Sequence, residues 1–537
     1  MRKLTPITFS LAAMVFLAAC GTSKVSFKNK MMISATEVPL KNAKIADNEL
    51  KRWSHLDLIK DTIPGMSVDR AYEELLQFRT PNPVIVAVID SGIDINHEDL
   101  QGKIWTNTKE IPDNKIDDDN NGYIDDINGW NYLGDVTKEN YEYTRIYHNP
   151  SLVDEATYAK VKAKVESGKE EAMQGKAQLE MMMNILKSSD SIVSKLLNKK
   201  DYTAEEVSKI ESTDEDVVRS KMMLGRMFQF GLPIEQLKEE IQKEYESMVA
   251  SSNDAPFVDY RSVVGDNPND LSDTNYGNNN VIGPDPKEAL HGTHVAGIIA
   301  QTRGNDLGGD GVVKENIQIM CLRAVPDGDE YDKDIALAIR YAVDNGAKVI
   351  NASFGKSFSP QKEWVWDALK YAASKDVLFV HAAGNSSEDI DVEDNYPTNL
   401  NNGQQVSDAF LEIGALNFEY GNKMVANFSN YGKKSIDIFS PGVQIYATTP
   451  ENEYQYLQGT SMASPNAAGV AALIRSYYPK LSAQQVRQII VDSGVLIEKD
   501  VNVGGDPKDN RPFKDISKNG KIINAFNALL LADKMAK

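Results

Sequence analysis

Basic charge is scarce in this sequence. Lys and Arg number 58 against 78 Asp and Glu, which gives a formal net charge of −20, and no basic stripe runs along the chain. Because nucleic acid is bound by clustered cations, we expect no nucleic-acid partner. Long apolar runs are scarce too: after the first twenty residues, no segment reaches the 18 unbroken apolar residues that suggest a membrane-spanning helix.

Cysteine is nearly absent, and the first of the two copies has a distinctive setting. Arg2-Lys3 precedes an apolar stretch, residues 7–19, which is too short to span a bilayer permanently. The stretch ends in Leu17-Ala18-Ala19-Cys20-Gly21, which resembles the lipobox of bacterial lipoprotein signal peptides. That resemblance implies a lipid on Cys20 and a place in the bacterial cell envelope, facing the periplasm or the cell surface. An ordinary secretory signal with a coincidental cysteine is the alternative.

The second cysteine, Cys321, is then left without a partner, so no disulfide framework is possible. It lies in an apolar run, residues 317–322. We therefore expect a buried strand residue rather than a reactive thiol. Lipid on Cys20 would be the only membrane anchor.

The remaining pattern predicts an α/β fold. At 537 residues the chain exceeds what one core usually holds, so we expect one large domain with additions. Residues 84–89 form a continuous β-branched run of the kind found in buried parallel strands. Further on, predicted strands and helices alternate, which indicates a mostly parallel sheet with helices on both faces. The strands are 317–325, 348–353 and 377–382, and the helices are 334–345, 363–374 and 521–531.

Residues 150–250 differ in character, being rich in Lys, Glu, Met and Ala. Apolar residues recur there at helical spacing, which predicts a helical hairpin or small bundle inserted into the main domain. The methionines of this segment are expected to pack between helices rather than to bind a metal or haem.

The turn Gly459-Thr460-Ser461-Met462-Ala463-Ser464-Pro465 precedes an apolar run with helical character. Ser461 is thus expected at or near a helix N-terminus, where unpaired N–H groups and the helix dipole favour negative charge. A nucleophile that passes through an oxyanion gains from that position. The alternative is a serine that only caps the helix.

Two further segments supply what a serine nucleophile needs. Asp90 ends the predicted strand 84–89, and carboxyl ends of strands are where sites gather in open α/β sheets. His291 and His294 open an apolar helical run. Metal ligation by this pair is disfavoured, because neither a Glu in the HExxH position nor a third ligand is present. A base paired with a carboxylate activates a serine hydroxyl, and the chain carries Asp, His and Ser in that order.

Three segments resemble the signatures of subtilisin-like serine peptidases: residues 86–94 (VAVIDSGID), 291–297 (HGTHVAG) and 459–465 (GTSMASP). The resemblance implies a three-layer α/β fold with a mostly parallel sheet, a catalytic triad of Asp90, His291 and Ser461, and a structural role for His294. In His381-Ala382-Ala383-Gly384-Asn385 it implies that Asn385 donates to the oxyanion. It also implies that Ser353, Phe354 and Gly355 pair with the substrate backbone and border its primary pocket.

The spacing sets this chain apart from simple subtilisins. His291 follows Asp90 by 201 residues, so an insertion of well over a hundred residues precedes the histidine. We expect a signal peptide in 1–20, a tether with a short helical extension in 21–80, a peptidase domain in 81–130 and 281–537, and a mostly helical insertion in 131–280. The insertion should emerge near the substrate cleft as a lid, a specificity wall or an intramolecular chaperone.

Calcium is expected to have a structural role. Residues 117–126 (DDDNNGYIDD) place oxygen ligands at alternate positions with Gly sixth, as in the first half of an EF-hand loop. The bidentate acid expected at the twelfth position is missing, and a solvated acidic turn is the alternative. The candidate ligands are Asp117, Asp119, Asn121 and Asp126. Relatives also often bind calcium where this chain has Asp99 and residues 305–311.

The sequence therefore predicts a serine endopeptidase that cleaves proteins through an acyl-enzyme and needs no cofactor for its chemistry. Its partners are expected to be protein or peptide substrates and, through the lipid, a membrane, and the chain is expected to be a monomer. Two alternatives remain. One is a restricted, tripeptidyl-type peptidase, and the other is a non-catalytic lipoprotein scaffold built on a peptidase fold.

Overall fold

The computed structural model describes residues 30–537, with the exception of residues 31, 34–37, 39–43, 229–233 and 253–256. The predicted signal peptide with Cys20, and the first part of the predicted tether, lie outside the described residues. Within the described part, no helix combines the length and the apolar character needed to cross a membrane.

A nine-stranded sheet forms the centre of the body. Its strands are β1 (Val84–Asp90), β2 (Gly129–Asn131), β3 (Ile317–Arg323), β4 (Val349–Ala352), β5 (Leu378–Ala382), β8 (Phe410–Leu416), β9 (Ile438–Pro441), β12 (Val495–Leu496) and β15 (Lys521–Ile522). Their order across the sheet is β12-β15-β9-β8-β5-β4-β1-β3-β2. All neighbours pair in parallel except β12 and β15. Three two-stranded ribbons accompany the sheet: β6 (Leu400–Asn401) with β7 (Gln404–Gln405), β10 (Ile445–Thr449) with β11 (Glu453–Leu457), and β13 (Asp500–Val503) with β14 (Asp506–Pro512).

Helices cover both faces of the sheet, because successive side chains of β1 point alternately into two different hydrophobic clusters. Val86 and Val88 belong to one hydrophobic cluster, and Ala87 and Ile89 belong to another. The first cluster includes residues of α9 (Leu290–Ala300), α12 (Thr460–Tyr477), α13 (Ala483–Ser493) and α14 (Ala525–Met535), and the second those of α10 (Asp332–Asp344) and α11 (Lys362–Ser374). The sheet is buried on both sides, which explains its unbroken apolar runs. The predicted three-layer α/β class is confirmed.

The last predicted helix, 521–531, is wrong at its start. Lys521 and Ile522 form β15, which pairs with β12 and β9. The helix α14 begins only at Ala525, where the Asn524 side chain accepts a hydrogen bond from the Asn527 amide. An N-cap of this kind satisfies an otherwise unpaired helix donor and fixes the boundary.

The segment before β1 packs into the body, where Ile33 already belongs to the first hydrophobic cluster and its amide donates to Asn527 Oδ1 at 2.6 Å. It carries α1 (Asp47–Leu50), α2 (Leu58–Asp61) and α3 (Val68–Ala71). Trp53 is 1% exposed and donates through Nε1 to the Val443 carbonyl at 2.9 Å. The Ser67 hydroxyl accepts a hydrogen bond from Asn524 at 2.8 Å. Much of the range 21–80 is therefore built into the body rather than hanging from it.

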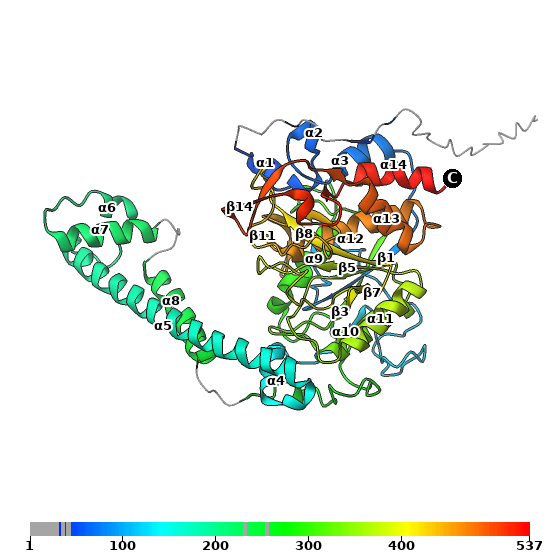
Figure 1. Cartoon of the computed structure of the whole chain (residues 1–537), viewed down its shortest axis with the longest axis horizontal. Helices are drawn as coiled ribbons and strands as arrows, with labels where there is room; N and C mark the ends of the chain where they lie inside the picture. The colour runs from blue at the N-terminus through cyan, green and yellow to red at the C-terminus, as the bar shows by residue number, and fades with distance from the viewer. Residues whose placement is uncertain (1–29, 31, 34–37, 39–43, 229–233, 253–256) are drawn as a thin grey trace, which may run out of the picture.

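The most unusual feature is an arm that extends away from the body (Figure 1). Its backbone is α5 (Glu155–Leu197), a helix of 43 residues, joined by α6 (Ala204–Ser208), α7 (Glu215–Met227) and α8 (Ile234–Ser252). The arm has a hydrophobic cluster of its own, which includes Leu186, Leu224, Met183 and Met227. The expectation that methionines pack between helices is confirmed at Met183 and Met227.

Both ends of the predicted insertion belong to the body. Tyr132 and Tyr276 are buried in the cluster beneath α10 and α11. Between β2 and the arm lies α4 (Glu142–His148), in which Glu142 and Arg145 are buried. The projecting part, α5 to α8, is thus narrower than the range 131–280.

Candidate active site

Asp90, at the end of β1, and His291, in the first turn of α9, form a close pair. His291 Nδ1 lies 2.7 Å from Asp90 Oδ1. Because a carboxylate only accepts, Nδ1 carries the proton and Nε2 is left as the acceptor of the ring. Burial lowers the pKa of His291, but the charge and hydrogen bond of Asp90 outweigh it, so the pKa lies above its ordinary value. The arrangement suits a base that takes a proton at Nε2.

His294 is turned into the protein. Its Nε2 lies 3.1 Å from the carbonyls of both Ile445 and Gln455, on the β10–β11 ribbon. Burial lowers the pKa of His294 to about 4, so the ring is neutral near pH 7 and donates from Nε2. The two histidines therefore have separate hydrogen-bond partners.

The register of the sheet brings Ser461 to the end of β1. Ile89 of β1 is aligned with Ala352 of β4, so Asp90 and Ser353 are the next residues at the same end of adjacent strands. Ser461, in the first turn of α12, donates from Oγ to the Ser353 carbonyl at 3.3 Å. The Ser353 hydroxyl in turn donates to the Ser461 carbonyl at 2.8 Å. Among the described residues, no hydrogen bond joins Ser461 to His291.

The side-chain amide of Asn385 is held in one orientation. Its Oδ1 accepts from the Thr460 amide at 2.8 Å and from the Thr460 hydroxyl at 3.0 Å. A backbone N–H can only donate, so the oxygen must face Thr460, and Nδ2 is left as a donor beside Ser461. Gly384 closes this arrangement by donating from its amide to the Thr460 hydroxyl.

The segment Ser353-Phe354-Gly355 continues from β4 along the cleft. The Phe354 carbonyl points inward and lies 2.8 Å from His381 Nε2, while His381 Nδ1 lies 2.9 Å from Glu412. Both ring nitrogens thus face acceptors, as an imidazolium requires. Burial lowers the pKa of His381, but Glu412 and the Phe354 carbonyl more than offset it and leave the pKa raised. Gly355 is exposed, so its backbone is free to meet an extended chain.

A cavity of about 290 Å³ opens beside Ser461. Phe354, Gly355 and Lys356 line one wall, and Ala382, Gly384 and Asn385 line the other. The cavity is also lined by Ser357, Ser386, Glu388, Asp394, Asn395, Asn430 and Thr460. The predicted nucleophile, oxyanion donor and substrate-binding segment therefore border one cavity.

Lys356 connects this cavity to the base of the arm. Its Nζ lies 2.7 Å from Glu142 Oε2, 2.7 Å from the Glu330 carbonyl and 2.9 Å from Asp332 Oδ1. Glu142, in α4, also pairs with Arg145 at 2.7 Å. Burial alone would raise the pKa of Glu142, but Arg145 and Lys356 overcome it and hold the pKa at about 2. A segment far from the motifs in sequence thus supports the wall of the cavity.

Several residues that hold the site were not predicted. Thr460 orients Asn385, His381 fixes the Phe354 carbonyl, and Glu142 balances Lys356. Thr460 and His381 lie inside recognised motifs, so the sequence could have indicated that they belong to the site. Glu142 had none, because it is 214 residues from Lys356.

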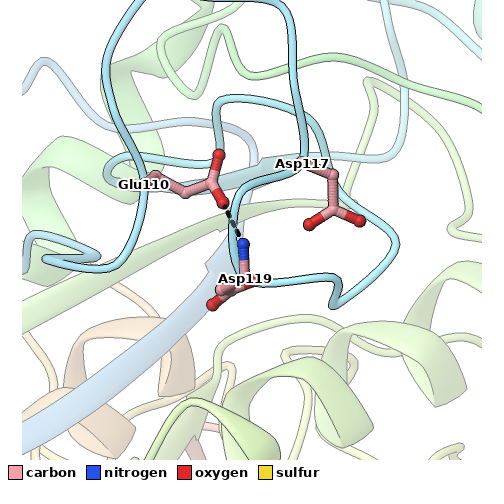
Figure 2. A group of neighbouring side chains, drawn as sticks. All are labelled: Glu110, Asp117 and Asp119. Carbon is pink, nitrogen blue, oxygen red and sulfur yellow. Dashed lines mark hydrogen bonds between the residues drawn. The ribbon is translucent and has the colours of Figure 1, made fainter.

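The acidic loop brings together a different set of carboxylates from the predicted one. Oxygens of Glu110, Asp117 and Asp119 lie within 4.8 Å of one another (Figure 2). Asn121 instead donates from Nδ2 to Asp126, and its Oδ1 accepts from the Tyr123 amide. A cluster of three carboxylates suits a hard cation such as Ca²⁺.

Asp126 and Asp99 have other surroundings. Asp126 is buried and accepts hydrogen bonds from Tyr341 and from Asn107, which also donates to Asp119, and its burial raises its pKa. Asp99 is also fully buried, and its Oδ1 accepts from Thr302 and Asn305. Its Oδ2 has no partner among the described residues, which leaves an acceptor for a cation.

Comparison with known proteins places these residues in one family. The family model described as "Subtilase family" matches residues 82–514. "Subtilisin-like protease 2" of Plasmodium falciparum (isolate 3D7) is 37% identical over 217 residues, which are 38% of this chain and 15% of that protein. "Subtilisin DY" of Bacillus licheniformis is 38% identical over 203 residues, 37% of this chain and 67% of that protein. A solved structure titled "Crystal structure of a cold adapted subtilisin-like serine proteinase" is 25% identical, with a TM-score of 0.35 over 44% of this chain and 74% of that one.

The chain spans less than a fifth of the first of these relatives, so the likeness concerns a shared domain. That domain includes Asp90, His291, Asn385 and Ser461, all within the matched range. Its match extends over more than half of the sequence and runs through both halves of the body on either side of the arm. The chain belongs to the subtilase family.

Proposed function

We propose that this chain is a serine endopeptidase that hydrolyses peptide bonds in proteins through an acyl-enzyme. The observation that carries the proposal is the 2.7 Å pairing of Asp90 with His291. It lies at the carboxyl end of β1, next to the first turn of the helix that contains Ser461. A serine hydroxyl is a weak nucleophile until a positioned base takes its proton.

In the proposed mechanism, Ser461 exchanges its bond to the Ser353 carbonyl for one to His291 Nε2 and attacks the scissile carbonyl. His291 takes the proton and returns it to the leaving amine, while Asp90 orients the ring and stabilises the imidazolium. The Asn385 Nδ2 and the Ser461 amide donate to the oxyanion. An extended substrate adds to the backbone of Ser353 and Gly355, which gives affinity largely independent of sequence.

The proposal is tested by hydrolysis of casein and of short peptides with blocked and free amino ends. An endopeptidase cleaves casein and blocked peptides, and the Ser461→Ala variant cleaves neither. A preference for free amino ends would favour the tripeptidyl-type peptidase. A folded wild-type protein that cleaves none of them would favour the scaffold.

We propose further that a lipid on Cys20 holds the enzyme to the bacterial envelope, facing the periplasm or the cell surface. The LAAC sequence that ends at Cys20 supports this. After expression in a bacterium, the wild type should be found in the membrane fraction and the Cys20→Ser variant should not. Equal membrane association of both proteins would contradict the lipid anchor.

Calcium is proposed as a structural ion, with no part in the chemistry. Glu110, Asp117 and Asp119 would hold it, and their clustered carboxylates support the fit. A cation that binds only the folded state raises the unfolding temperature with its concentration. Calcium should therefore raise the unfolding temperature of the wild type in EDTA-treated samples and affect the Asp117→Asn variant less. An equal response of both proteins would place the ion elsewhere, with Asp99 the next candidate.

A further inference from the structure

Asn395 lines the cavity beside Ser461 and lies close to both of its walls. A Cβ atom built on Gly355, in one wall, would lie 3.2 Å from Asn395 Oδ1, and one built on Gly384, in the other, would lie 3.6 Å from it. Asn395 Nδ2 donates to the Ala383 carbonyl at 3.1 Å, which fixes the amide. Its Oδ1 accepts no hydrogen bond from the described residues and lies next to Gly355 and Gly384, which line the cavity, so it is available there as an acceptor.

Among the described residues, Lys356 is the one cation that lines the cavity, and it has no donor to spare. Lys356 is only 2% exposed; its Nζ donates to Glu142 and to the Glu330 carbonyl, and Asp332 Oδ1 lies 2.9 Å from it as a third partner. An ammonium has three donors, so none is left for a substrate. The charge of Lys356 is balanced by the same carboxylates.

The remaining charged groups of the cavity are carboxylates. Glu388 and Asp394 both line it and are exposed. Lys160, from the first turns of α5, lies with its Nζ 3.7 Å from Asp394 Oδ2, so this rim already holds an ammonium group of the chain itself. The two side chains are 71% and 59% exposed, and such a pair contributes little and yields easily to a competing cation.

We propose that this cavity selects substrates with Lys or Arg at the residue whose carbonyl is attacked. The methylene stem of such a side chain would lie along Phe354 and Ala382, and its cationic end would donate to Asn395 Oδ1 and to the two carboxylates. An apolar side chain would displace water from these acceptors without replacing its hydrogen bonds. The inference rests on the proposed peptidase function and adds its substrate class.

The test compares blocked peptides that differ only at this residue, which is Lys, Arg or norleucine. Norleucine keeps a linear apolar stem and lacks the ammonium. The ratio of kcat/KM for Lys over norleucine should be at least about tenfold, the scale of one charge-assisted hydrogen bond. The ratio should fall severalfold in Asp394→Asn and Glu388→Gln, which keep shape and remove charge, and in Asn395→Leu, which removes the acceptor. Glu393→Gln, an exposed neighbour outside the cavity, is the matched control and should keep the wild-type ratio.

Casein hydrolysis by the same samples separates the two claims. Protein that cleaves casein but prefers norleucine, or that keeps its ratio in all three cavity variants, overturns the substrate class and leaves the peptidase function standing. Folded wild-type protein that cleaves neither casein nor any peptide overturns the function itself.

Discussion

The body and the arm differ in how deeply their strongest ion pairs are buried. In the body, Lys356 and Arg145 are buried and share the carboxylate of Glu142. In the arm, pairs such as Lys209 with Glu205 and Arg219 with Asp216 are exposed to solvent. Removing one partner of a buried pair leaves an uncompensated charge, whereas exposed pairs contribute little. Buried ion pairs therefore fix the positions of side chains in the body. The arm is stabilised by its own apolar cluster.

The body holds the residues of the site in position, whereas most of the arm extends away from the site. The site lies where strand ends, helix N-termini and buried ion pairs converge, and α4 brings one part of the insertion into that network. The projecting helices contribute Lys160 at the rim but otherwise extend away (Figure 1). Changes in the body should alter catalysis, and changes in the arm cluster should not.

The largest effect is expected from Asp90→Asn. Loss of the carboxylate removes what fixes the His291 tautomer and stabilises its charged form, so kcat should fall by about 10⁴-fold. Steady-state kinetics on a blocked peptide measures this, and circular dichroism should show unchanged helix content. A loss of less than about tenfold would deny Asp90 this role.

The same variant carries a pH prediction. Asp90 raises the pKa of His291 against the effect of burial, and only the neutral ring acts as a base. Wild-type kcat/KM should therefore rise with pH through this raised pKa. In Asp90→Asn, burial lowers the pKa of His291 with no carboxylate to oppose it. The increase of the residual activity with pH should therefore begin at a lower pH than in the wild type. A rise at the same pH in both proteins would contradict the assignment.

Next is Glu142→Gln, which keeps shape and removes the charge shared by Arg145 and Lys356. The free energy of unfolding of the body should fall by about 3–5 kcal/mol, as when one partner of a buried pair is removed. Urea unfolding followed by tryptophan fluorescence measures it. Glu155→Gln, at an exposed position in the first turn of α5, should leave stability unchanged.

The difference between wild type and Glu142→Gln should also depend on pH. The pKa of Glu142 is lowered to about 2 in the folded state, so its contribution is present above the ordinary pKa of a glutamate. It is lost as the pH falls toward 2. A difference that grew on acidification would contradict this sign.

Asn385→Ala tests the oxyanion donor. Removing one such donor costs about 10²–10³ in kcat in subtilisin, and we expect the same range here with KM little changed. The substitution leaves the Thr460 hydroxyl and amide without their acceptor, so Asn385→Asp, which keeps that acceptor and removes the Nδ2 donor, is a second variant. A rise in KM at constant kcat would assign Asn385 to substrate binding instead.

The smallest effect on activity is expected from the arm. Leu224 is fully buried in the arm cluster, and Leu224→Ala should destabilise that cluster by about 2–5 kcal/mol. Hydrogen exchange should become faster in α5 to α8 alone, while kcat/KM on a short peptide stays within about twofold. Leu473→Ala, the same change in the core of the body, should speed exchange around α12. Loss of activity in Leu224→Ala would show that the arm and the site are coupled.

Sequence predicted those parts of the site that depend on local pattern. Asp90 and Ser461 stand at a strand end and a helix start, and each carries its context within a few residues. The free acceptor of Asn395 and the pairing of Glu142 with Lys356 depend on contacts across the fold, which no local pattern encodes. In the acidic loop the expected spacing named Asn121 and Asp126, but both are drawn into other hydrogen bonds, and Glu110 enters from outside the motif.

The most direct test of the central claim is labelling of the folded protein with a fluorophosphonate, followed by mass spectrometry of its peptides. Such a probe forms a covalent bond with an activated serine. We expect one label per chain, on the peptide that contains Ser461, and no label after Ser461→Ala. His291→Ala should slow labelling strongly, because the hydroxyl then lacks its base. A label on another serine, or none on folded and uninhibited wild-type protein, would contradict the account.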